Sequence, residues 1–406
     1  MTNPASTPRR PGSIELAVLL GTMISVAPFS IDMYLPALPE LGREFGTSIA
    51  EVQRTLTTFF IGFAAGQAFA GPFVDRFGRK PPLFVGLVLF ILTSIGCAFA
   101  PSIHALAALR LLQALGACVG GVVARAVVRD LLSPQEGARM LSHMLLTMGI
   151  APLVAPLVGG YVLIAFGWQA IFLILGGIGV LIFAASALRL PETLKPENAR
   201  KLHGIAIVRD YAWLLRQRGY ISYTVAGGLS QGGLFAYIAA SPHVFIDYFG
   251  VRAQNFGWIF AVNVAGMMVV SQLGAAMLKR HRSDTILRLV QSIQVTAGLA
   301  LVIGAVTGIG GMWSILLPLV AYMACTGAVM PNATALAMAD YGHIAGLAAA
   351  LLGSISFGIA AMASFVVGIM PGEGAVPMAV TIAVCASAGL ACNLLATRRR
   401  DRQSPI

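Results

Sequence analysis

Twelve long runs of mostly apolar residues constrain this chain more than any other feature of its sequence. A lipid bilayer has a hydrocarbon core about 30 Å thick, which an α-helix of about 20 residues can cross. Charged residues make up only 11% of the 406 residues, against about 25% in soluble domains. We therefore predict an all-α membrane protein with twelve transmembrane helices. They cover approximately residues 15–37, 55–74, 82–100, 103–128, 140–165, 168–188, 219–246, 254–278, 285–307, 313–338, 344–370 and 375–396.

A single long and polar connection divides the twelve runs into two blocks of six. It holds seven basic and three acidic residues. This arrangement predicts two pseudo-symmetric six-helix bundles, as a duplicated unit would give. The expected organisation is an N-terminal bundle over residues 1–188, a cytoplasmic linker over 189–218 and a C-terminal bundle over 219–406.

Basic residues are distributed unevenly between the two ends of the predicted helices. If the N-terminus is cytoplasmic, the cytoplasmic segments hold 22 Lys and Arg residues, and the opposite side holds only Arg43, Arg54 and Arg252. Cytoplasmic loops of membrane proteins carry such an excess, so we expect both chain termini in the cytoplasm. The net charge of +11 then reflects membrane topology. We expect contact with the lipid bilayer and none with nucleic acid.

Two charged residues lie well inside apolar runs, away from the ends of the predicted spans, where an ionisable group is costly and usually has a function. Asp32 lies in the first run, and burial of a carboxyl group favours its neutral form, so Asp32 is a candidate proton carrier. Alternatively, it lies at a helix end and reaches the membrane surface, because Pro36 and Pro39 follow. Arg110, in the fourth run, could hold a nearby Asp32 carboxylate in its ionised form, or could simply tie helices together.

The short polar loop between the second and third runs is dense in glycine and charge. Its glycines permit close approach of backbones, and one Asp stands among three cations. Such a turn could bind a neighbouring helix end and release it, although a plain cytoplasmic stop-transfer loop is the alternative. The predicted conformational latch comprises Gly71, Asp75, Arg76, Gly78, Arg79 and Lys80, joined by Arg129 and Asp130 at the end of the fourth run.

The fifth run and the second half of the chain contain weaker signals. Prolines and small residues kink a helix and let another pack closely, and by composition alone the fifth run shows ordinary membrane packing. Its residues of this kind are Gly149, Pro152, Pro156, Gly159 and Gly160. The second half offers neutral polar and aromatic groups, which could contact a mostly apolar substrate or join helices to each other. They are Gln231, Phe235, Tyr237, Asn263 and Asn332.

Other classes of function lack their usual residues in this sequence. The six histidines are scattered without metal-ligand spacing, and the five cysteines form no C-x-x-C motif. A G-x-x-x-x-G-K-[ST] loop for nucleotide phosphates is also missing. We therefore expect no metal, no cofactor and no enzyme activity, and a transporter that does not use ATP.

Several segments match motifs of known transporters. Residues 71–80 follow the pattern G-x-x-x-D-R-x-G-R-K. Arg110 with Gln113 is similar to the pattern R-x-x-Q-G-x-G, although Ala114 stands at its first glycine. The fifth run is similar to an antiporter motif of the fifth span. With residues 32–36, 190–194 and 331–334, these segments resemble the major facilitator superfamily, and more narrowly its Bcr/CflA group of bacterial drug:proton antiporters.

This resemblance implies roles for the residues already singled out. Asp32 would be the protonation site, Arg110 its modulator, and the charged loop a latch that stabilises the outward-open state. Asp32 and Tyr34 would contact the substrate together with the five residues of the second half. Some relatives have a second acid at the place of Ile24. Its absence here favours neutral or monocationic substrates.

The resemblance also implies an overall activity. The chain would be a monomer in the bacterial inner membrane that exports chloramphenicol-like or florfenicol-like drugs, or other small antibiotics, in exchange for protons. The alternative within the superfamily is an exporter or proton symporter of a small metabolite, such as a sugar or an amino acid.

Overall fold

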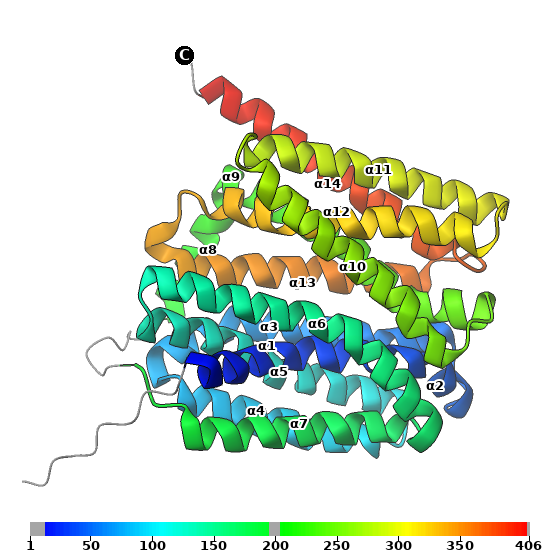
Figure 1. Ribbon diagram of the computed structural model, residues 1–406, viewed down its shortest axis with the longest axis horizontal. Helices are drawn as coiled ribbons and strands as arrows, with labels where there is room; N and C mark the ends of the chain where they lie inside the picture. The colour runs from blue at the N-terminus through cyan, green and yellow to red at the C-terminus, as the bar shows by residue number, and fades with distance from the viewer. Residues whose placement is uncertain (1–12, 195–203, 404–406) are drawn as a thin grey trace, which may run out of the picture.

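The structure is a computed structural model that describes residues 13–194 and 204–403, and Figure 1 shows its helices lying side by side. Within these ranges every regular element is a helix. The first part contains α1 (Ser13–Asp32), η1 (Leu35–Ala37), α2 (Leu38–Glu44), α3 (Ile49–Phe77), α4 (Lys80–Ala98), α5 (Ile103–Leu131), α6 (Pro134–Phe166) and α7 (Trp168–Arg189). The second contains α8 (Gly204–Arg216), α9 (Arg218–Pro242), η3 (His243–Tyr248), α10 (Ala253–Met277), α11 (Ser283–Thr307), α12 (Met312–Met338), η4 (Gly342–Ile344), α13 (Ala345–Ile369) and α14 (Val376–Gln403).

Each of the twelve predicted apolar runs coincides with a helix. In the described ranges, eleven segments are long and apolar enough to cross a membrane. The predicted seventh span, α9, is not among them. Its glycines, serines and Gln231 lower its mean hydropathy, although its 25 residues are long enough to cross. A twelfth crossing, made by α9, therefore stays a prediction.

Serine residues begin three of the long helices of the first half. The side-chain oxygens of Ser48 and Ser102 accept hydrogen bonds from the backbone N–H groups three residues later, over 3.3 Å and 3.2 Å. Ser133 forms the reciprocal version, because Glu136 also bonds back to the backbone N–H of Ser133 over 3.0 Å. Each cap satisfies a donor that the first turn of a helix leaves free. The short turns thus fix where α3, α5 and α6 start.

The two halves of the chain repeat one pattern of helix neighbours. In the first half, α1 packs on α5, α6 and α7, α5 packs on α3 and α4, and α4 packs on α7. In the second half, α9 packs on α12, α13 and α14, α12 packs on α10 and α11, and α11 packs on α14. The same six-helix arrangement therefore occurs twice, as a duplicated unit would have it.

Two helix pairs join the halves. Along α3 and α13, Thr57 and Ser364 share a hydrogen bond of 3.0 Å, and Ser354 donates to the carbonyl of Ala64 over 2.9 Å. Along α6 and α10, the absence of a side chain at Gly160 lets it lie against the backbone of Ala253. Small and hydroxyl residues at these contacts allow close packing inside a membrane, where the hydrophobic effect does not drive helices together.

The connection between the halves contains a helix that the sequence did not lead us to expect. Helix α8 packs on α9 and α13 of the second half. Leu214 is fully buried there, whereas Val208 and Trp213 are 67% and 42% exposed. The predicted linker, residues 189–218, is therefore partly a helix that belongs structurally with the second half; its residues 195–203 lie outside the described part.

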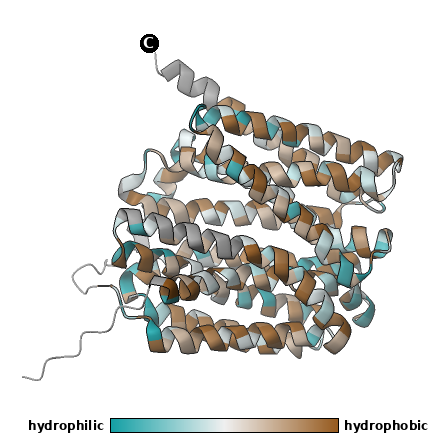
Figure 2. Ribbon diagram, viewed as in Figure 1, coloured by the Kyte–Doolittle hydropathy of each residue, from teal (hydrophilic) through white to brown (hydrophobic). Residues whose placement is uncertain are grey.

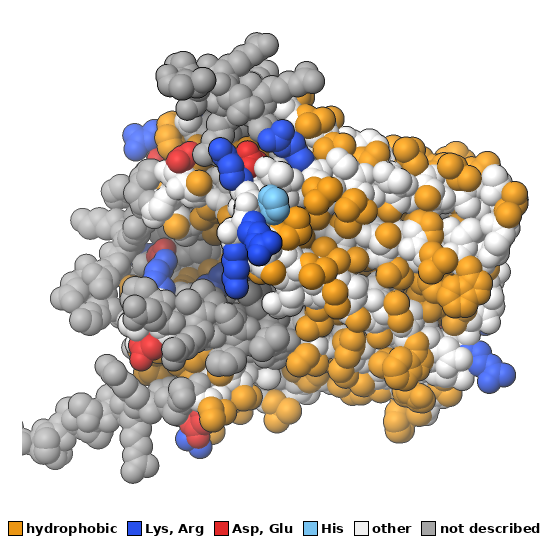
Figure 3. All heavy atoms as spheres, turned by 45° about the horizontal axis from the view of Figure 1, so that its top comes forward, with side chains coloured by type: hydrophobic (Ala, Val, Ile, Leu, Met, Phe, Trp, Pro, Cys, Tyr) orange, Lys and Arg blue, Asp and Glu red, His pale blue; other side chains and the backbone are white. Residues whose placement is uncertain are grey.

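One end of the molecule is rich in Lys and Arg, and we call it the basic end. It contains the turns α3–α4, α5–α6 and α10–α11, the residues after α7, and α8. Figure 3 shows blue side chains gathered there, on the left, with a largely apolar surface between them and the other end. Figure 2 shows the same apolar middle along the helices. Large apolar side chains are exposed on this surface, for example Val85 and Leu181 at 70% each, as expected of a lipid-facing belt.

The fifth-run glycines bring α6 against two neighbours. A Cβ at Gly159 would overlap the carbonyl oxygen of Met33, just beyond the end of α1, and one at Gly160 would lie 2.8 Å from the carbonyl oxygen of Ala253. Gly159 thus permits a contact inside the first half, and Gly160 permits one between the halves. Backbone atoms cannot rotate away from an added methyl group, so both positions require glycine.

We predict that Gly159→Ala destabilises the protein, because its Cβ meets backbone. The expected loss is about 1–3 kcal/mol, as for overpacking of a core. Gly177→Ala in α7 is the matched control, since nothing lies within 4 Å of its Cβ. Thermal unfolding of the purified variants in detergent measures both effects, and equal midpoints for the two variants would contradict the close approach of α6 to α1.

Candidate functional site

Asp32 is the last residue of α1, and only 3% of it is exposed. This burial does not fit the alternative that its side chain reaches the membrane surface. One other carboxylate, Asp284, is buried in the described ranges, and it forms ion pairs with Arg282 and Arg288 at 3.4 Å and 3.7 Å. The structure shows no ion pair for Asp32. Among the described residues, Asp32 is therefore a buried carboxyl group without an ionic partner.

Asp32 lies near a polar residue of the second half. Its carboxyl group is close enough to Tyr237, on α9, to act on it electrostatically. The hydroxyl of Tyr237 accepts a hydrogen bond of 3.3 Å from Asn263 on α10, whose amide also donates to the carbonyl of Ile259 over 2.9 Å. The amide oxygen of Asn263 is buried without a partner. Three of the predicted site residues thus lie near one another where the two halves meet: Tyr237 and Asn263 are hydrogen-bonded, and Asp32 lies within electrostatic range of Tyr237.

Aromatic rings line the same interface nearer the basic end. The ring centroid of Phe235 on α9 lies 4.5 Å from that of Phe60 on α3 and 5.4 Å from that of Phe357 on α13. Phe63 and Phe357 are 4.4 Å apart. Gln231 lies one turn before Phe235 on α9 and is partly buried. Phe235 and Gln231 are therefore placed between the halves, as a residue that contacts substrate would be.

Arg110 on α5 lies in a different place from Asp32. It is fully buried and donates hydrogen bonds to the carbonyl of Ser30 over 2.9 Å and to Gln113 over 2.7 Å. Two of its nitrogens, Nε and Nη2, have no hydrogen-bond partner. The guanidinium lies 4.3 Å from the ring centre of Phe59 and 4.8 Å from that of Tyr34, where ring faces attract a cation.

The expectation that Arg110 holds Asp32 as a neighbouring ion does not match this geometry. The two side chains form no ion pair in the structure. Arg110 instead bonds the carbonyl of Ser30, one of the last four carbonyls of α1, which lack donors within the helix. It acts on the end of α1 two residues before Asp32. The helix-tying alternative describes the observed contacts.

Two predicted substrate residues lie away from this interface. Tyr34 is fully buried in the first half, where its hydroxyl shares a hydrogen bond of 2.9 Å with Thr55 and its ring faces Arg110. Asn332 lies in the last two turns of α12, near the basic end, and its amide donates to the carbonyl of Ala328 over 2.8 Å. The structure does not bring either residue into the Asp32 group.

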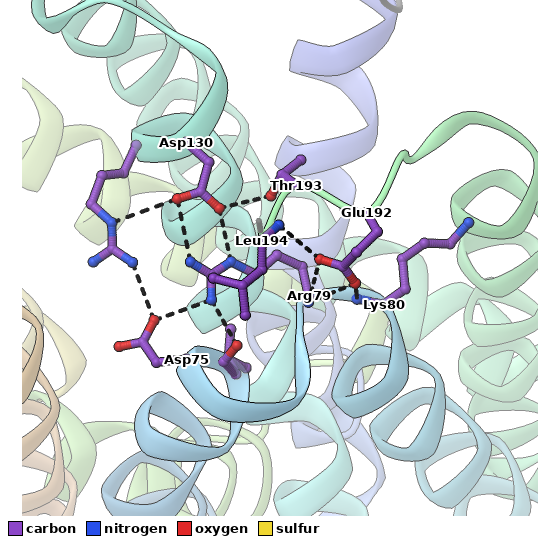
Figure 4. A network of polar contacts seen from close by, with 9 residues as sticks. Asp75, Arg79, Lys80, Asp130, Glu192, Thr193 and Leu194 are labelled. Carbon is purple, nitrogen blue, oxygen red and sulfur yellow. Dashed lines mark hydrogen bonds and ion pairs between the residues drawn. The ribbon is translucent and has the colours of Figure 1, made fainter. Parts of the chain in front are cut away.

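The predicted latch residues meet around Arg79 (Figure 4). The side chain of Arg79 is 2% exposed and donates to Asp75 over 3.1 Å, to Asp130 over 2.8 Å and to the carbonyl of Val74 over 2.6 Å. Arg129 completes the group with a contact of 3.2 Å to Asp75. The C-terminal carbonyls of α3 therefore receive a cation, which also opposes the helix dipole. Four charges with a sum of zero gather within the first half.

Glu192, just after α7, occupies the start of α4. Its carboxylate accepts the backbone N–H groups of Arg79 and Lys80 over 2.9–3.0 Å, and that of Leu194 over 3.0 Å. Burial alone would raise the pKa of Glu192, but these backbone hydrogen bonds outweigh burial and hold its pKa below the ordinary value of 4.5. Gly78 has φ +94°, and a side chain there would collide with the carboxylate. Gly78 must therefore be glycine for two reasons, its positive φ and the space that the Glu192 carboxylate occupies.

Sequence reasoning gave no role to Glu192 or to Thr193, whose hydroxyl donates to Asp130 over 2.7 Å. The available signals were the family resemblance of residues 190–194 and the position of two polar residues directly after the last apolar run of the first half. Three other latch residues contribute differently. Lys80 takes part through its backbone, Arg76 is exposed, and a Cβ added at Gly71 would lie 3.9 Å from that of Ala350 on α13.

The antiporter-motif residues all lie on α6, which packs on α1 and α10. Pro152 and Pro156 are inside the helix, and a Cβ added at Gly149 would lie 3.8 Å from the side chain of Met268 on α10. Gly159 and Gly160 let α6 pack closely on the end of α1 in its own half and on α10 of the other half. Within the described residues, no three His, Cys, Asp or Glu side chains gather as a metal site would need.

Comparisons with known proteins agree with this architecture. The model of the Major Facilitator Superfamily matches residues 19–365. A bicyclomycin resistance protein homolog of Haemophilus influenzae is 34% identical to this chain, and the aligned part covers 90% of this chain and 92% of the homolog. A chloramphenicol resistance protein of Pseudomonas aeruginosa is 28% identical over 92% and 90%. The solved structure of a D-xylose-proton symporter, 16% identical, has a TM-score of 0.75 over 95% and 96% of the two chains, a likeness of fold. The chain therefore belongs to the Major Facilitator Superfamily of membrane transporters.

Proposed function

We propose that this protein exports small, largely apolar drugs in exchange for protons, by alternating rotation of its two halves. The observation that carries the proposal is Asp32, a buried carboxyl group without an ionic partner at the boundary between the halves. In this proposal α9, the seventh helix of the twelve predicted, also crosses the membrane. The basic end, with both termini, faces the cytoplasm. The protein works as a monomer in the bacterial inner membrane.

The class of substrate follows from relatives and from the boundary itself. The two relatives described above are named for resistance to bicyclomycin and chloramphenicol, both antibiotics. Phe60, Phe235 and Phe357 supply apolar contact area between the halves, which holds small ligands mainly by burial. Position 24, where some relatives have a second acid, is isoleucine here, so no second carboxylate is available there to bind a dicationic drug. Neutral or monocationic drugs of the phenicol kind therefore suit this site.

Proton coupling rests on the difference between a carboxyl group shielded from water and one in contact with water. An ionised carboxylate without a partner is strongly disfavoured in an apolar environment. With the halves closed around it, Asp32 carries a proton; when water reaches it, the ionised form becomes accessible. Substrate arriving from the cytoplasm and the proton from outside then compete for the same boundary. Arg110 serves by fixing the carbonyl of Ser30 and hence the end of α1.

The cluster of Asp75, Arg79, Arg129 and Asp130 has a mechanical role in this proposal. Its ion pairs join the ends of α3 and α5, and Glu192 adds the residues after α7 to the start of α4. These contacts lie inside the first half. They let its basic end move as one body while α3 and α13 separate.

The proposed role of Asp32 predicts the behaviour of the variant Asp32→Asn. The amide keeps the shape of the side chain and cannot take up the proton, so drug-driven proton release should be abolished while folding persists. The assay uses inverted membrane vesicles with an acidic interior, to which phenicols, other neutral antibiotics and monovalent lipophilic cations are added one at a time. Asp340→Asn is the control, because Asp340 is exposed. Undiminished proton release in Asp32→Asn would remove Asp32 from the mechanism.

The second prediction concerns Glu192→Gln, which removes the anion at the start of α4. Because the pKa of Glu192 is lowered, its charge stabilises the fold above pH 4.5 and stops doing so as the pH falls through the lowered pKa. Glu192→Gln should therefore lower the melting temperature by about 1–3 °C at pH 7.

The same difference should shrink as the pH falls below 4.5. Glu15→Gln is the matched control, since Glu15 is 57% exposed and its one contact, with Arg189, is 3.7 Å long. Melting curves from pH 7 to pH 4 in detergent test both variants. A deficit that stays constant over this range would show that the charge of Glu192 is not what stabilises the turn.

A further inference from the structure

A proline inside α3 leaves one backbone carbonyl without its usual partner. Pro72 has no N–H group, so the carbonyl of Ala68, four residues earlier, receives no hydrogen bond from within the helix. The hydroxyl of Tyr211 donates to this carbonyl over 2.9 Å. A side chain of the linker helix α8 thus supplies the donor that α3 lacks.

Tyr211 belongs to the second half, whereas Ala68 belongs to the first. Helix α8 packs on α9 and α13. Leu214 is buried in the cluster of the second half, Tyr211 packs against that cluster, and the ring of Trp213 meets that of Tyr341 at 5.9 Å. Burial raises the pKa of Tyr211 to about 12, so its hydroxyl keeps its proton at physiological pH. The hydrogen bond therefore links the two halves at the basic end.

A neighbouring contact shows why this bond differs from others. One turn earlier on α3, Ser354 of α13 donates to the carbonyl of Ala64. That carbonyl can also receive the N–H of Ala68, so loss of Ser354 leaves it satisfied. Loss of the Tyr211 hydroxyl leaves the part-buried Ala68 carbonyl without its protein donor, which is costly as long as the carbonyl stays shielded. Water can replace the bond, and separation of α3 and α13 would expose the carbonyl to it more fully.

We propose that Tyr211 is a releasable clasp that stabilises the arrangement closed at the basic end, and that Pro72 creates the vacant carbonyl on which the clasp depends. When the basic end opens, water replaces the tyrosine hydroxyl on Ala68. The inference rests on one part of the proposed function, the movement of the halves, and is independent of substrate and proton.

The test measures the opening of the basic end directly. Spin labels are attached to Phe77→Cys in the first half and Lys279→Cys in the second, after the native cysteines are replaced. Both positions are exposed. Pulsed electron resonance gives the distribution of distances between them without any drug. Loss of one hydrogen bond in Tyr211→Phe should raise the ratio of open to closed molecules about fivefold.

A double variant tests the role of Pro72. In Pro72→Ala the new N–H of residue 72 can bond the Ala68 carbonyl inside α3, so adding Tyr211→Phe should change the ratio less than about twofold. Tyr220→Phe is the control, because Tyr220 donates to Ala348 over 2.6 Å within the second half. It should leave the ratio unchanged even if it lowers the melting temperature.

Three comparisons between variants would overturn the clasp. They are an unchanged ratio in Tyr211→Phe, an equal shift by Tyr211→Phe in the Pro72→Ala background, and an equal shift by Tyr220→Phe. A distribution without open molecules in any variant would also overturn it. Failure of drug-driven proton release would contradict the proposed function and leave these distances unaffected, so the two failures are distinguishable.

Discussion

Backbone polar groups inside a bilayer must find their partners within the protein, and this constraint locates many of the contacts between helices. Helices satisfy their own backbones except at their ends and at proline. Those exceptions are where side chains from other helices come in. Arg110 bonds a carbonyl at the end of α1, Arg79 bonds one at the end of α3, and Tyr211 bonds the one that Pro72 leaves free. These contacts between distant helices thus form where a backbone carbonyl lacks a hydrogen-bond donor within its own helix.

The two halves share a packing pattern and differ in the chemistry of their interiors. In the first half, Arg110, Gln113 and Ser94 form a charged network that joins α4 and α5 and reaches α1. In the second half, Gln294 on α11 bonds Ser230 on α9 and Thr326 on α12, without charge. The same three positions of the repeated arrangement, its first, third and fourth long helices, are tied in both halves. The duplicated architecture therefore tolerates either a charged or a neutral tie.

The sequence predicted those features that follow from length, apolarity and local motif. The spans appear as helices because about 20 apolar residues leave few alternatives, and the residues around Arg79 were identifiable because glycine and charge are dense in one loop. The partners from elsewhere in the chain were not. Glu192 and Tyr211 lie 113 and 143 residues from the backbone groups they bind. Asp32 and Arg110 share a half and yet face different neighbours, which spacing along the chain does not determine.

The isolation of Asp32 has an electrical consequence. The four charges around Arg79 sum to zero, so their movement transfers no net charge through the membrane field. In the proposed exchange, voltage acts instead through the change of protonation of Asp32, at about 2.3 kcal/mol per charge for each 100 mV. If one proton enters for each neutral drug that leaves, a membrane potential negative inside drives export. If the drug carries one positive charge, the same exchange is electrically silent and depends on the pH difference alone.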